Sequence, residues 1–310
     1  MDGRYAPSPS GELHLGNLRT ALVAWLMARS GGSRFVVRVE DLDAGRSREQ
    51  FVASQLGDLR ALGLDWDGEV VRQSDRHGRY EDALSTLRDA GLLYECFCTR
   101  AEIRQAVSAP HGPGPEGVYP GTCAGLTAAA RQAHLDAGRR PALRVRADRA
   151  TATIHDRIAG PVTATVDDFV VRRSDGAHAY NLAVVVDDAD QGIQEVVRGA
   201  DLLDTTPRQA WLAGRLGVTG PVAYAHVPLV LGPDGARMAK RHGAVTLRGQ
   251  LDAGWTPGQV VGALAASLGL SAAGEAADPR ALLTAWDLAR LPREPVVMGA
   301  LAPHLTGEAG

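Results

Sequence analysis

The sequence predicts an α/β protein built on a doubly wound parallel sheet, with an inserted domain of mixed structure and a short helical C-terminal region. Strand-like and helix-like segments alternate over residues 1–92, and buried-strand character returns over 179–232. The segment between them, 93–178, differs because it holds all three cysteines and the Pro/Gly-rich stretch Pro110–Pro120. We therefore expect one sheet domain in two halves around an insertion, followed by a C-terminal region over 233–310.

The first half of the sheet domain opens with an amphipathic helix and a strand. Apolar residues recur with the helical period from Leu18 to Leu26, and Asn17 is placed to cap that helix. Glycines and serines at 30–33 end it, and the β-branched run 35–39 predicts a buried strand. The other elements expected before the second half are helices at 48–62 and 76–90 and strands at Ala142–Val145 and Ile154–Ile158.

The second half is marked by apolar runs. Leu182–Val186 and Val196–Val197 predict buried strands. Thr206, which is followed by a proline, suits the start of a helix that runs to Leu216. Residues 224–231 form a last apolar run before the loops and helices of the C-terminal region.

Composition limits the class of protein. The chain has 310 residues, of which 45% are hydrophobic and 22% charged, so it can bury a core and is not a disordered chain. A formal net charge of -3 argues against a protein that coats nucleic acid, although not against one that docks a small RNA feature. We find neither an apolar run of about 18 residues nor a signal peptide, and expect a cytoplasmic monomer without membrane contact.

Lysine usage singles out one residue. Among the 33 lysines and arginines, Lys240 is the only lysine. A codon bias toward arginine explains the other positions, but a compact ammonium acts on phosphate as a point charge, which a planar guanidinium does less well. Lys240 is therefore a candidate functional residue, and a surface lysine that persists by chance is the alternative.

Two loops far apart in the chain have the character of anion sites. Arg4–Asn17 combines prolines, glycines and the N-terminus of the first helix, with His14 one turn before Asn17. Gly235–Gly243 is flanked by glycines and holds three cations within five residues. Neither is a known phosphate-loop or dinucleotide fingerprint. Alone, each could be an ordinary turn, but the pair favours a nucleotide.

These loops resemble the paired signatures of the class I aminoacyl-tRNA synthetases. His14–Asn17 resembles the HIGH-type motif and Arg237–Arg241 the KMSKS-type motif. The resemblance covers most of residues 1–245 and implies a Rossmann-like fold. Further segments are similar to the glutamyl branch of that family, namely Arg4–Gly11, Arg38–Asp43, Tyr180–Asp188 and Val197–Leu203.

Length narrows the resemblance within this branch. The residues after 245 are too few for the anticodon-binding domain that full-length glutamyl-tRNA synthetases carry. Small chains of this design with a zinc site resemble the glutamyl-Q tRNA(Asp) synthetase family, which attaches glutamate to the queuosine base in the anticodon of tRNA(Asp). The resemblance implies ATP, L-glutamate and queuosine-bearing tRNA(Asp) as partners, and activation of glutamate without tRNA.

The resemblance also implies a glutamate pocket. Arg4 and Arg198 would bind the two carboxylates, since guanidinium forks match carboxylate geometry. Glu40 would meet the ammonium, Tyr180 would hold the substrate through its phenol, and Ser8 would belong to the same pocket. Without the motifs, ordinary surface or core roles for these residues would be the better interpretation.

The ATP site follows from the same resemblance. His14, Gly16, Asn17 and Lys240 would bind ATP, which arrives with Mg²⁺. His14 and Lys240 would be the catalytic pair, because they would stabilise charge on the phosphates while glutamyl-adenylate forms. The KMSKS-type motif departs from the family pattern, since its first lysine is Arg237 and its serine is alanine, which puts the role of Arg237 in doubt.

The cysteines predict one structural zinc ion. Cys96, Cys98 and Cys123 lie close together in the sequence, and thiolates are preferred zinc ligands. A tetrahedral site needs a fourth ligand, and on chemistry alone His111 is the first choice. The family resemblance implies Tyr119 instead, so both remain open. Three reduced, metal-free cysteines are the alternative.

Three competing functions remain at this point. The chain could aminoacylate tRNA(Glu) as an ordinary glutamyl-tRNA synthetase does. It could be a non-catalytic relative that only binds glutamate, nucleotide or RNA. It could also be a nucleotidyltransferase of the same superfold that acts on a small molecule, because a fold does not fix a function.

Overall fold

The structure, a computed structural model, describes most of the chain. The described residues are 1–107, 119–218, 223–232, 234–236 and 246–297. In them the main sheet has seven strands, in the spatial order β3 (Val71–Arg72), β2 (Phe35–Val39), β1 (Gly3–Tyr5), β9 (Glu195–Gly199), β10 (Ala223–Val227), β6 (Thr151–Asp156) and β7 (Gly160–Thr165).

The helices account for much of the remaining described chain. They are α1 (Leu15–Ser30), α2 (Glu49–Ala61), α3 (His77–Asp89), α4 (Arg100–Val107), α5 (Ala128–Asp136), α6 (Tyr180–Asp190), α7 (Thr206–Arg215), α8 (Leu247–Asp252), α9 (Pro257–Ala266) and α10 (Pro279–Leu282). Short 3-10 turns cover Gln73–Asp75, Ala200–Thr205 and Leu288–Arg290.

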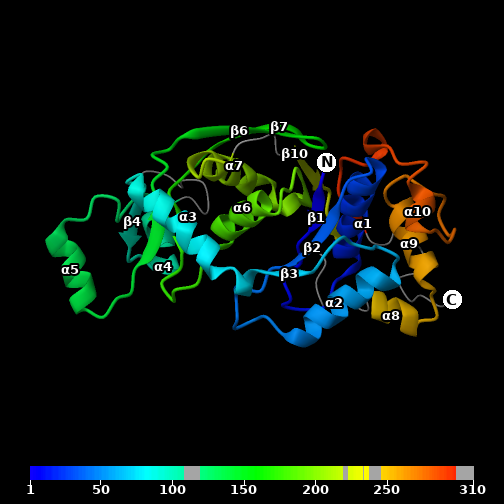
Figure 1. Cartoon of the computed structure of the whole chain (residues 1–310), viewed down its shortest axis with the longest axis horizontal. Helices are drawn as coiled ribbons and strands as arrows, with labels where there is room; N and C mark the ends of the chain where they lie inside the picture. The colour runs from blue at the N-terminus through cyan, green and yellow to red at the C-terminus, as the bar shows by residue number, and fades with distance from the viewer. Residues whose placement is uncertain (108–118, 219–222, 233, 237–245, 298–310) are drawn as a thin grey trace.

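Helices cover both faces of the main sheet (Figure 1). Side chains alternate along a strand, so neighbouring residues face opposite layers. Val37 and Val197 belong to the core that contains α1, whereas Val36 and Val196 pack in a cluster with Ala210 of α7. The α/β doubly wound fold predicted from the strand–helix alternation is confirmed.

The order of the parallel strands reverses beside β1. The chain proceeds outward from β1 to β2 and β3 on one side, and from β9 to β10 on the other. In open α/β sheets, ligands bind at the carboxyl ends of the strands where the order reverses. The fold therefore directs attention to the residues that follow β1, β2, β9 and β10.

Residues 93–178 contribute to two different sheets. Strands β4 (Leu93–Cys96), β5 (Ala142–Val145) and β8 (Phe169–Arg172) form a separate antiparallel sheet. The hairpin β6–β7 instead extends the main sheet, because β6 pairs in parallel with β10 through Asp156 and Tyr224. The strand predicted at Ala142–Val145 is confirmed, and the one predicted at Ile154–Ile158 begins three residues earlier and ends at Asp156.

The strand predicted at Leu182–Val186 is wrong, because these residues lie inside helix α6. A short apolar run cannot by itself distinguish a buried strand from a buried helix. Helical winding places Tyr180 and Asp188 on the same side, and Asp187 and Asp188 then reach arginines of neighbouring elements. These tertiary contacts outweigh the β-propensity of the three consecutive valines.

Two predicted helix starts are shifted. Asn17 is not the N-cap of α1; His14 caps it, and Asn17 is the third helical residue. Thr206 is already inside α7, whose N-cap is Thr205, and the proline follows in the first turn as predicted. Leu216 is the C-cap of this helix, close to its predicted end.

The C-terminal region is helical, as predicted. Helices α8, α9 and α10 pack near α1, and Figure 1 shows them gathered at one end of the molecule. The buried Arg19 of α1 donates to the carbonyl oxygen of Pro228 and to the hydroxyl of Ser267, which joins this region to the sheet domain. In the described part of the chain, no helix is long and apolar enough to cross a membrane.

Candidate active site

A cleft of about 620 Å³ opens at the carboxyl ends of the central strands. Its walls come from the segments that follow β1, β2, β9 and β10, which is the place that the strand order indicates. The predicted site residues that line it are Arg4, Ser8, His14, Gly16, Asn17, Glu40, Tyr180 and Arg198. The structure thus brings together residues that are up to 194 positions apart in the sequence.

The N-terminus of α1 closes one side of the cleft with a capping box. The Nδ1 atom of His14 accepts a hydrogen bond from the backbone N–H of Asn17 at 3.2 Å, and the Asn17 side chain accepts one from the His14 N–H at 3.2 Å. Burial lowers the pKa of His14, although Asp201 opposes the shift, so the ring is neutral at pH 7. Since Nδ1 accepts, the proton sits on Nε2, which leaves that atom as a donor.

Glycine leaves room next to this imidazole. A Cβ atom on Gly16 would lie 3.1 Å from both Cε1 and Nδ1 of His14. A larger residue would therefore crowd the ring, which would have to shift by a few tenths of an ångström. A glycine two residues after His14 therefore leaves room for the imidazole as well as for a ligand.

The loop before His14 is held from α2. The buried side chain of Gln55 donates through Nε2 to the carbonyl oxygens of Ser8 at 3.1 Å and Gly11 at 2.7 Å. The Ser8 side chain itself is exposed and lines the cleft. Sequence reasoning did not select Gln55, because a single polar residue on the inner face of a helix carries no motif.

The second predicted anion loop lies mostly outside the described residues. Lys240, Arg237 and Ala239 belong to the segment 237–245, of which the structure gives no description. The described residues near it lie at the cleft: Val230 lines its wall, and Thr246 forms an antiparallel bridge with His14.

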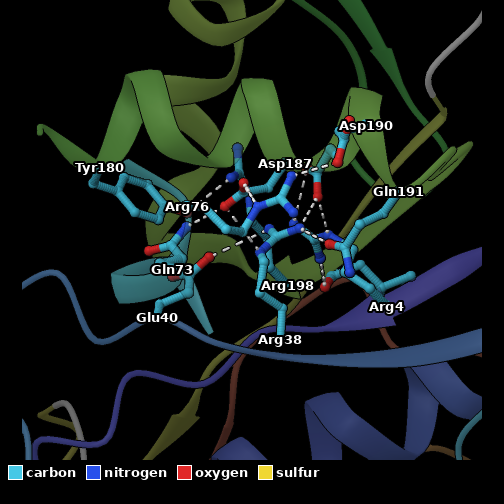
Figure 2. A network of polar contacts seen from close by, with 12 residues as sticks. Arg4, Arg38, Glu40, Gln73, Arg76, Tyr180, Asp187, Asp190, Gln191 and Arg198 are labelled. Atoms are coloured by element: carbon cyan, nitrogen blue, oxygen red, sulfur yellow. Dashed lines mark hydrogen bonds and ion pairs between the residues drawn. The ribbon is translucent and has the colours of Figure 1, made fainter. Parts of the chain in front are cut away.

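Below the cleft lies a buried ion-pair network, which Figure 2 shows between α6 and the strands. Its inner members are Arg4, Arg38, Arg76, Glu40, Asp187 and Asp188, and it continues outward from Arg76 to Asp190 and Arg79. Asp188 accepts from Arg4 Nε at 3.0 Å and from Arg38 at 2.8 Å. Burial opposes ionisation of Asp188, but the two arginines outweigh it and hold its pKa below the usual value. The network fixes Arg4 and supports the floor of the cleft.

Glu40 presents a carboxylate to the cleft, where burial and nearby arginines have opposite effects on its ionisation. It follows the end of β2, is almost fully buried, and has Arg38 as its ion-pair partner at 3.4 Å. Burial raises the pKa of Glu40, although Arg38 and Arg4 oppose the shift. A second cation beside Glu40 would stabilise its charged form.

Arg198 differs from the other arginines of the cleft, because all of its partners are uncharged. Its Nε donates to His226 Nε2 at 3.0 Å, and its terminal nitrogens donate to the Tyr180 hydroxyl at 3.1 Å and the Thr206 hydroxyl at 2.8 Å. Only 6% of Arg198 is exposed, and no carboxylate in the described part of the chain forms an ion pair with it. A buried guanidinium without a counter-charge is a receptor for an anionic ligand group.

Three cysteines converge at the end of β4. The Sγ atoms of Cys96, Cys98 and Cys123 lie within 4.8 Å of one another, and those of Cys98 and Cys123 are 3.4 Å apart. Burial and the neighbouring Cys123 raise the pKa of the Cys98 thiol to about 12, so it ionises near neutral pH only beside a positive charge. This cluster can hold a metal ion.

Tyr119 completes a four-atom set that fits zinc. Its hydroxyl oxygen lies 3.4 Å from Cys96 Sγ and 3.8 Å from Cys98 Sγ, and it accepts from the Cys123 backbone N–H at 2.8 Å. Tetrahedral zinc with Zn–S bonds of about 2.3 Å separates its ligand atoms by similar distances. The other candidate, His111, lies outside the described residues.

Sequence reasoning missed one residue beside the cysteines. The guanidinium of Arg144 lies 3.6 Å from the centre of the Tyr119 ring. Arg144 is on β5 and is largely buried. A single arginine within a short strand carries no motif, so only the fold reveals this placement.

The groups that line the cleft are suited to bind a nucleotide and a small acidic ligand. A helix N-terminus and an Nε2–H donor at His14 suit phosphates. A buried carboxylate at Glu40 suits an ammonium, and the uncompensated Arg198 suits a carboxylate.

Comparisons with known proteins agree with this arrangement. The family model of the catalytic domain of class I tRNA synthetases (E and Q) matches residues 1–277. Glutamyl-Q tRNA(Asp) synthetase of Nocardia farcinica is 59% identical over 304 residues, which cover 97% of this chain and 95% of the relative. Glutamate–tRNA ligase 1 of Caldanaerobacter subterraneus is 39% identical over 262 residues, which cover 83% of this chain and 54% of the relative.

The comparison with solved structures shows the same fold. The crystal structure of a glutamate tRNA ligase from Elizabethkingia meningosepticum superposes with a TM-score of 0.81 at 24% identity, over 97% of this chain and 67% of that one. The match over residues 1–277 and the 59% identity across nearly the whole chain show that this chain belongs to the glutamyl-Q tRNA(Asp) synthetase family of class I synthetases.

Proposed function

We propose that this chain activates L-glutamate with ATP, without tRNA, and transfers the glutamyl group to the queuosine base in the anticodon of tRNA(Asp). The observation that carries the activation step is Arg198, a buried guanidinium with only neutral partners in a cleft that also holds Glu40. The acceptor is inferred from the name of the Nocardia relative and the high identity to it.

In the first step an oxygen of the substrate α-carboxylate attacks the α-phosphorus of ATP. The bond from that phosphorus to the bridging oxygen breaks, and pyrophosphate leaves with Mg²⁺. The protein supplies position and charge. Arg4 and Arg198 bind the carboxylates, Glu40 receives the ammonium, and Tyr180 and Ser8 complete the pocket.

The phosphates lie against the N-terminus of α1 in this proposal. His14 donates from Nε2 to a phosphate oxygen, and Gly16 and Asn17 let the nucleotide approach the backbone. Lys240 neutralises the leaving pyrophosphate. Thr246, the first described residue after its segment, pairs with His14 of the cleft, which supports this assignment.

In the second step a hydroxyl of the queuosine cyclopentene ring attacks the glutamyl carbonyl carbon, and AMP leaves. The hydroxyl proton is lost as the ester forms. The adenylate must therefore stay accessible to an RNA base at the open side of the cleft.

We also propose one structural zinc ion held by Cys96, Cys98, Tyr119 and Cys123. The convergence of four donor atoms at distances suited to a tetrahedron supports it. Such an ion would fix the end of β4 and stabilise the small antiparallel sheet.

Two assays test the function. Glutamate-dependent ATP–pyrophosphate exchange without tRNA should proceed, and labelled glutamate should enter queuosine-containing tRNA(Asp) but not the same tRNA made without modification. Exchange that requires tRNA, together with charging of tRNA(Glu), would instead assign the ordinary glutamyl-tRNA synthetase reaction. A chain that binds glutamate yet shows neither reaction would be a binding protein, and the proposal would be wrong.

A further inference from the structure

A chain of three buried residues crosses the main sheet from β6, next to the edge strand β7, to the cleft. His226 on β10 lies directly opposite Arg198 on β9, and the Nδ1 atom of His226 is 2.7 Å from a carboxylate oxygen of Asp156 on β6. Asp156 pairs with the residue at 224, so the three side chains come from three adjacent parallel strands. His226 is 1% exposed and Asp156 4%.

Hydrogen-bond chemistry fixes the tautomer of His226. A guanidinium only donates, so Nε2 of His226 accepts from Arg198 Nε and carries no proton. The remaining proton is on Nδ1, which donates to Asp156. Burial lowers the pKa of His226, although Asp156 opposes the shift, and the neutral ring is the form that the contact with Arg198 needs.

Asp156 is itself held in place. It accepts from the backbone N–H groups of Ile158 at 2.9 Å and Ala159 at 2.8 Å, besides its contacts with His226. Burial opposes its ionisation, but the His226 hydrogen bond and these backbone donors outweigh it and lower its pKa. The carboxylate therefore stays charged and can orient the imidazole.

Arg198 keeps two donors for a ligand. A guanidinium has five N–H groups, and three of them point to His226, Tyr180 and Thr206. One N–H on each terminal nitrogen remains, so Arg198 can still donate two hydrogen bonds to a carboxylate. The direction of this pair is set by the contact at Nε, because that contact fixes the rotation of the guanidinium plane.

We propose that His226 and Asp156 are positioning residues that orient Arg198 toward the substrate carboxylate. The proposal rests on the proposed function, in which Arg198 binds glutamate. In it, Asp156 selects the tautomer of His226, and His226 fixes the plane of Arg198 before the substrate arrives. Arg198 then needs little reorganisation when glutamate binds. This increases the affinity for glutamate and leaves the affinity for ATP unchanged.

Two substitutions at one position separate this role from simple core packing. The His226→Gln side chain can place its carbonyl oxygen near the Nε2 position, so Arg198 keeps an acceptor. The His226→Asn side chain is shorter, so it can still donate to Asp156 but cannot reach Arg198. A packing role would be disturbed by both changes and more by the smaller Asn, so the loss of stability must be measured beside the KM.

In glutamate-dependent ATP–pyrophosphate exchange, His226→Asn should raise the KM for glutamate roughly tenfold or more, because a buried donor of Arg198 loses its acceptor. The KM for ATP and kcat should change by less than about threefold. His226→Gln should remain within about threefold of the unsubstituted chain for glutamate. Thermal unfolding midpoints of both variants report whether either change acts through stability alone.

A third variant, Asp156→Asn, tests the role of the carboxylate. An amide at 156 can donate to Nδ1, which moves the ring proton to Nε2 and sets it against the Arg198 N–H. The KM for glutamate should again rise roughly tenfold. In the His226→Gln background the same substitution should have little effect on this KM, since no ring tautomer remains to be changed.

The outcomes are distinct. An active chain in which His226→Asn leaves the KM for glutamate unchanged, or in which both position-226 variants raise it equally, overturns the positioning role and leaves the proposed function standing. An equal effect of Asp156→Asn in both backgrounds overturns the role of Asp156. Failure of the unsubstituted chain to exchange, with and without tRNA, overturns the proposed function and this inference with it.

Discussion

The sharpest consequence of the cleft geometry concerns Arg198→Ala. In the proposed complex this guanidinium is the counter-charge of a substrate carboxylate. No carboxylate of the described chain contacts Arg198 in place of the substrate's. Truncating one partner of a buried, hydrogen-bonded charge pair costs about 2–5 kcal/mol. At about 1.4 kcal/mol per factor of ten, the KM for glutamate should rise between about 30-fold and about 4,000-fold.

The stability of the free protein should respond much less to Arg198→Ala. The variant loses hydrogen bonds to three neutral groups, but it also removes a buried charge that has no counter-ion. We expect the unfolding midpoint to shift by only a few degrees while glutamate binding collapses. This separation is typical of a residue kept for function at the expense of stability.

Arg198→Lys and a remote arginine provide the controls. A lysine keeps the charge but cannot contact His226, Tyr180 and a carboxylate together, so the KM should rise by about tenfold to a hundredfold. Arg215→Ala should leave the KM unchanged, because Arg215 packs on Trp211 and does not line the cleft. The KM of each of the three variants is measured by ATP–pyrophosphate exchange at a series of glutamate concentrations. A rise of less than about threefold in Arg198→Ala would refute the reasoning, since a lost buried pair cannot cost so little.

Three further expectations follow from other parts of the molecule. Cys123→Ser should lower the zinc content measured by mass spectrometry and reduce the unfolding midpoint, and an unchanged metal content would contradict the proposed site. Glu40→Gln should raise the KM for glutamate by roughly tenfold or more. Because burial raises the pKa of Glu40, its contribution to stability is full below its ordinary pKa and is lost as the pH rises through the raised value. The Gln variant should therefore be the more stable one at pH 7 in urea unfolding, and an equal or lower stability would count against a buried charged Glu40. Gly262→Ala should destabilise the fold by about 1–3 kcal/mol or more, because its Cβ would lie 1.7 Å from the carbonyl oxygen of Glu275. The matched change Gly57→Ala meets no atom within 4 Å and should be neutral or stabilise α2, so an equal loss in both variants would exclude the clash as the cause.

Local signals in the sequence were sufficient for the sheet domain and much of the cleft. The alternation of strands and helices predicted the doubly wound fold, and spacing placed His14 and Asn17 at a helix start. Resemblance added Arg4 and Glu40, which the structure brings to the same cleft. These features could be read because each is encoded over a few consecutive residues.

Features that depend on distant pairings could not be read in this way. The run at Leu182–Val186 belongs to a helix, and Asp187, which follows it, pairs with Arg38 and Arg76. These arginines lie more than a hundred residues earlier in the chain. His226 and Asp156 come from strands whose adjacency is known only from the sheet order. A lone histidine on an apolar strand is otherwise indistinguishable from a core residue.

The charge balance of the buried groups gives a reason why the cleft would select glutamate. The ion-pair network below the cleft continues through Arg76 to Asp190 and Arg79, so it contains four guanidiniums and four carboxylates and is neutral as a whole. Arg198 adds one positive charge that no carboxylate in the described chain contacts directly, since the charged Asp156 lies behind His226. In the proposed pocket L-glutamate offers two carboxylates, one each for Arg4 and Arg198, whereas glutamine offers one and would leave one of these guanidiniums without a carboxylate. Since an uncompensated buried charge costs several kcal/mol, we infer that the neutral surroundings of Arg198 themselves contribute to discrimination between the two amino acids.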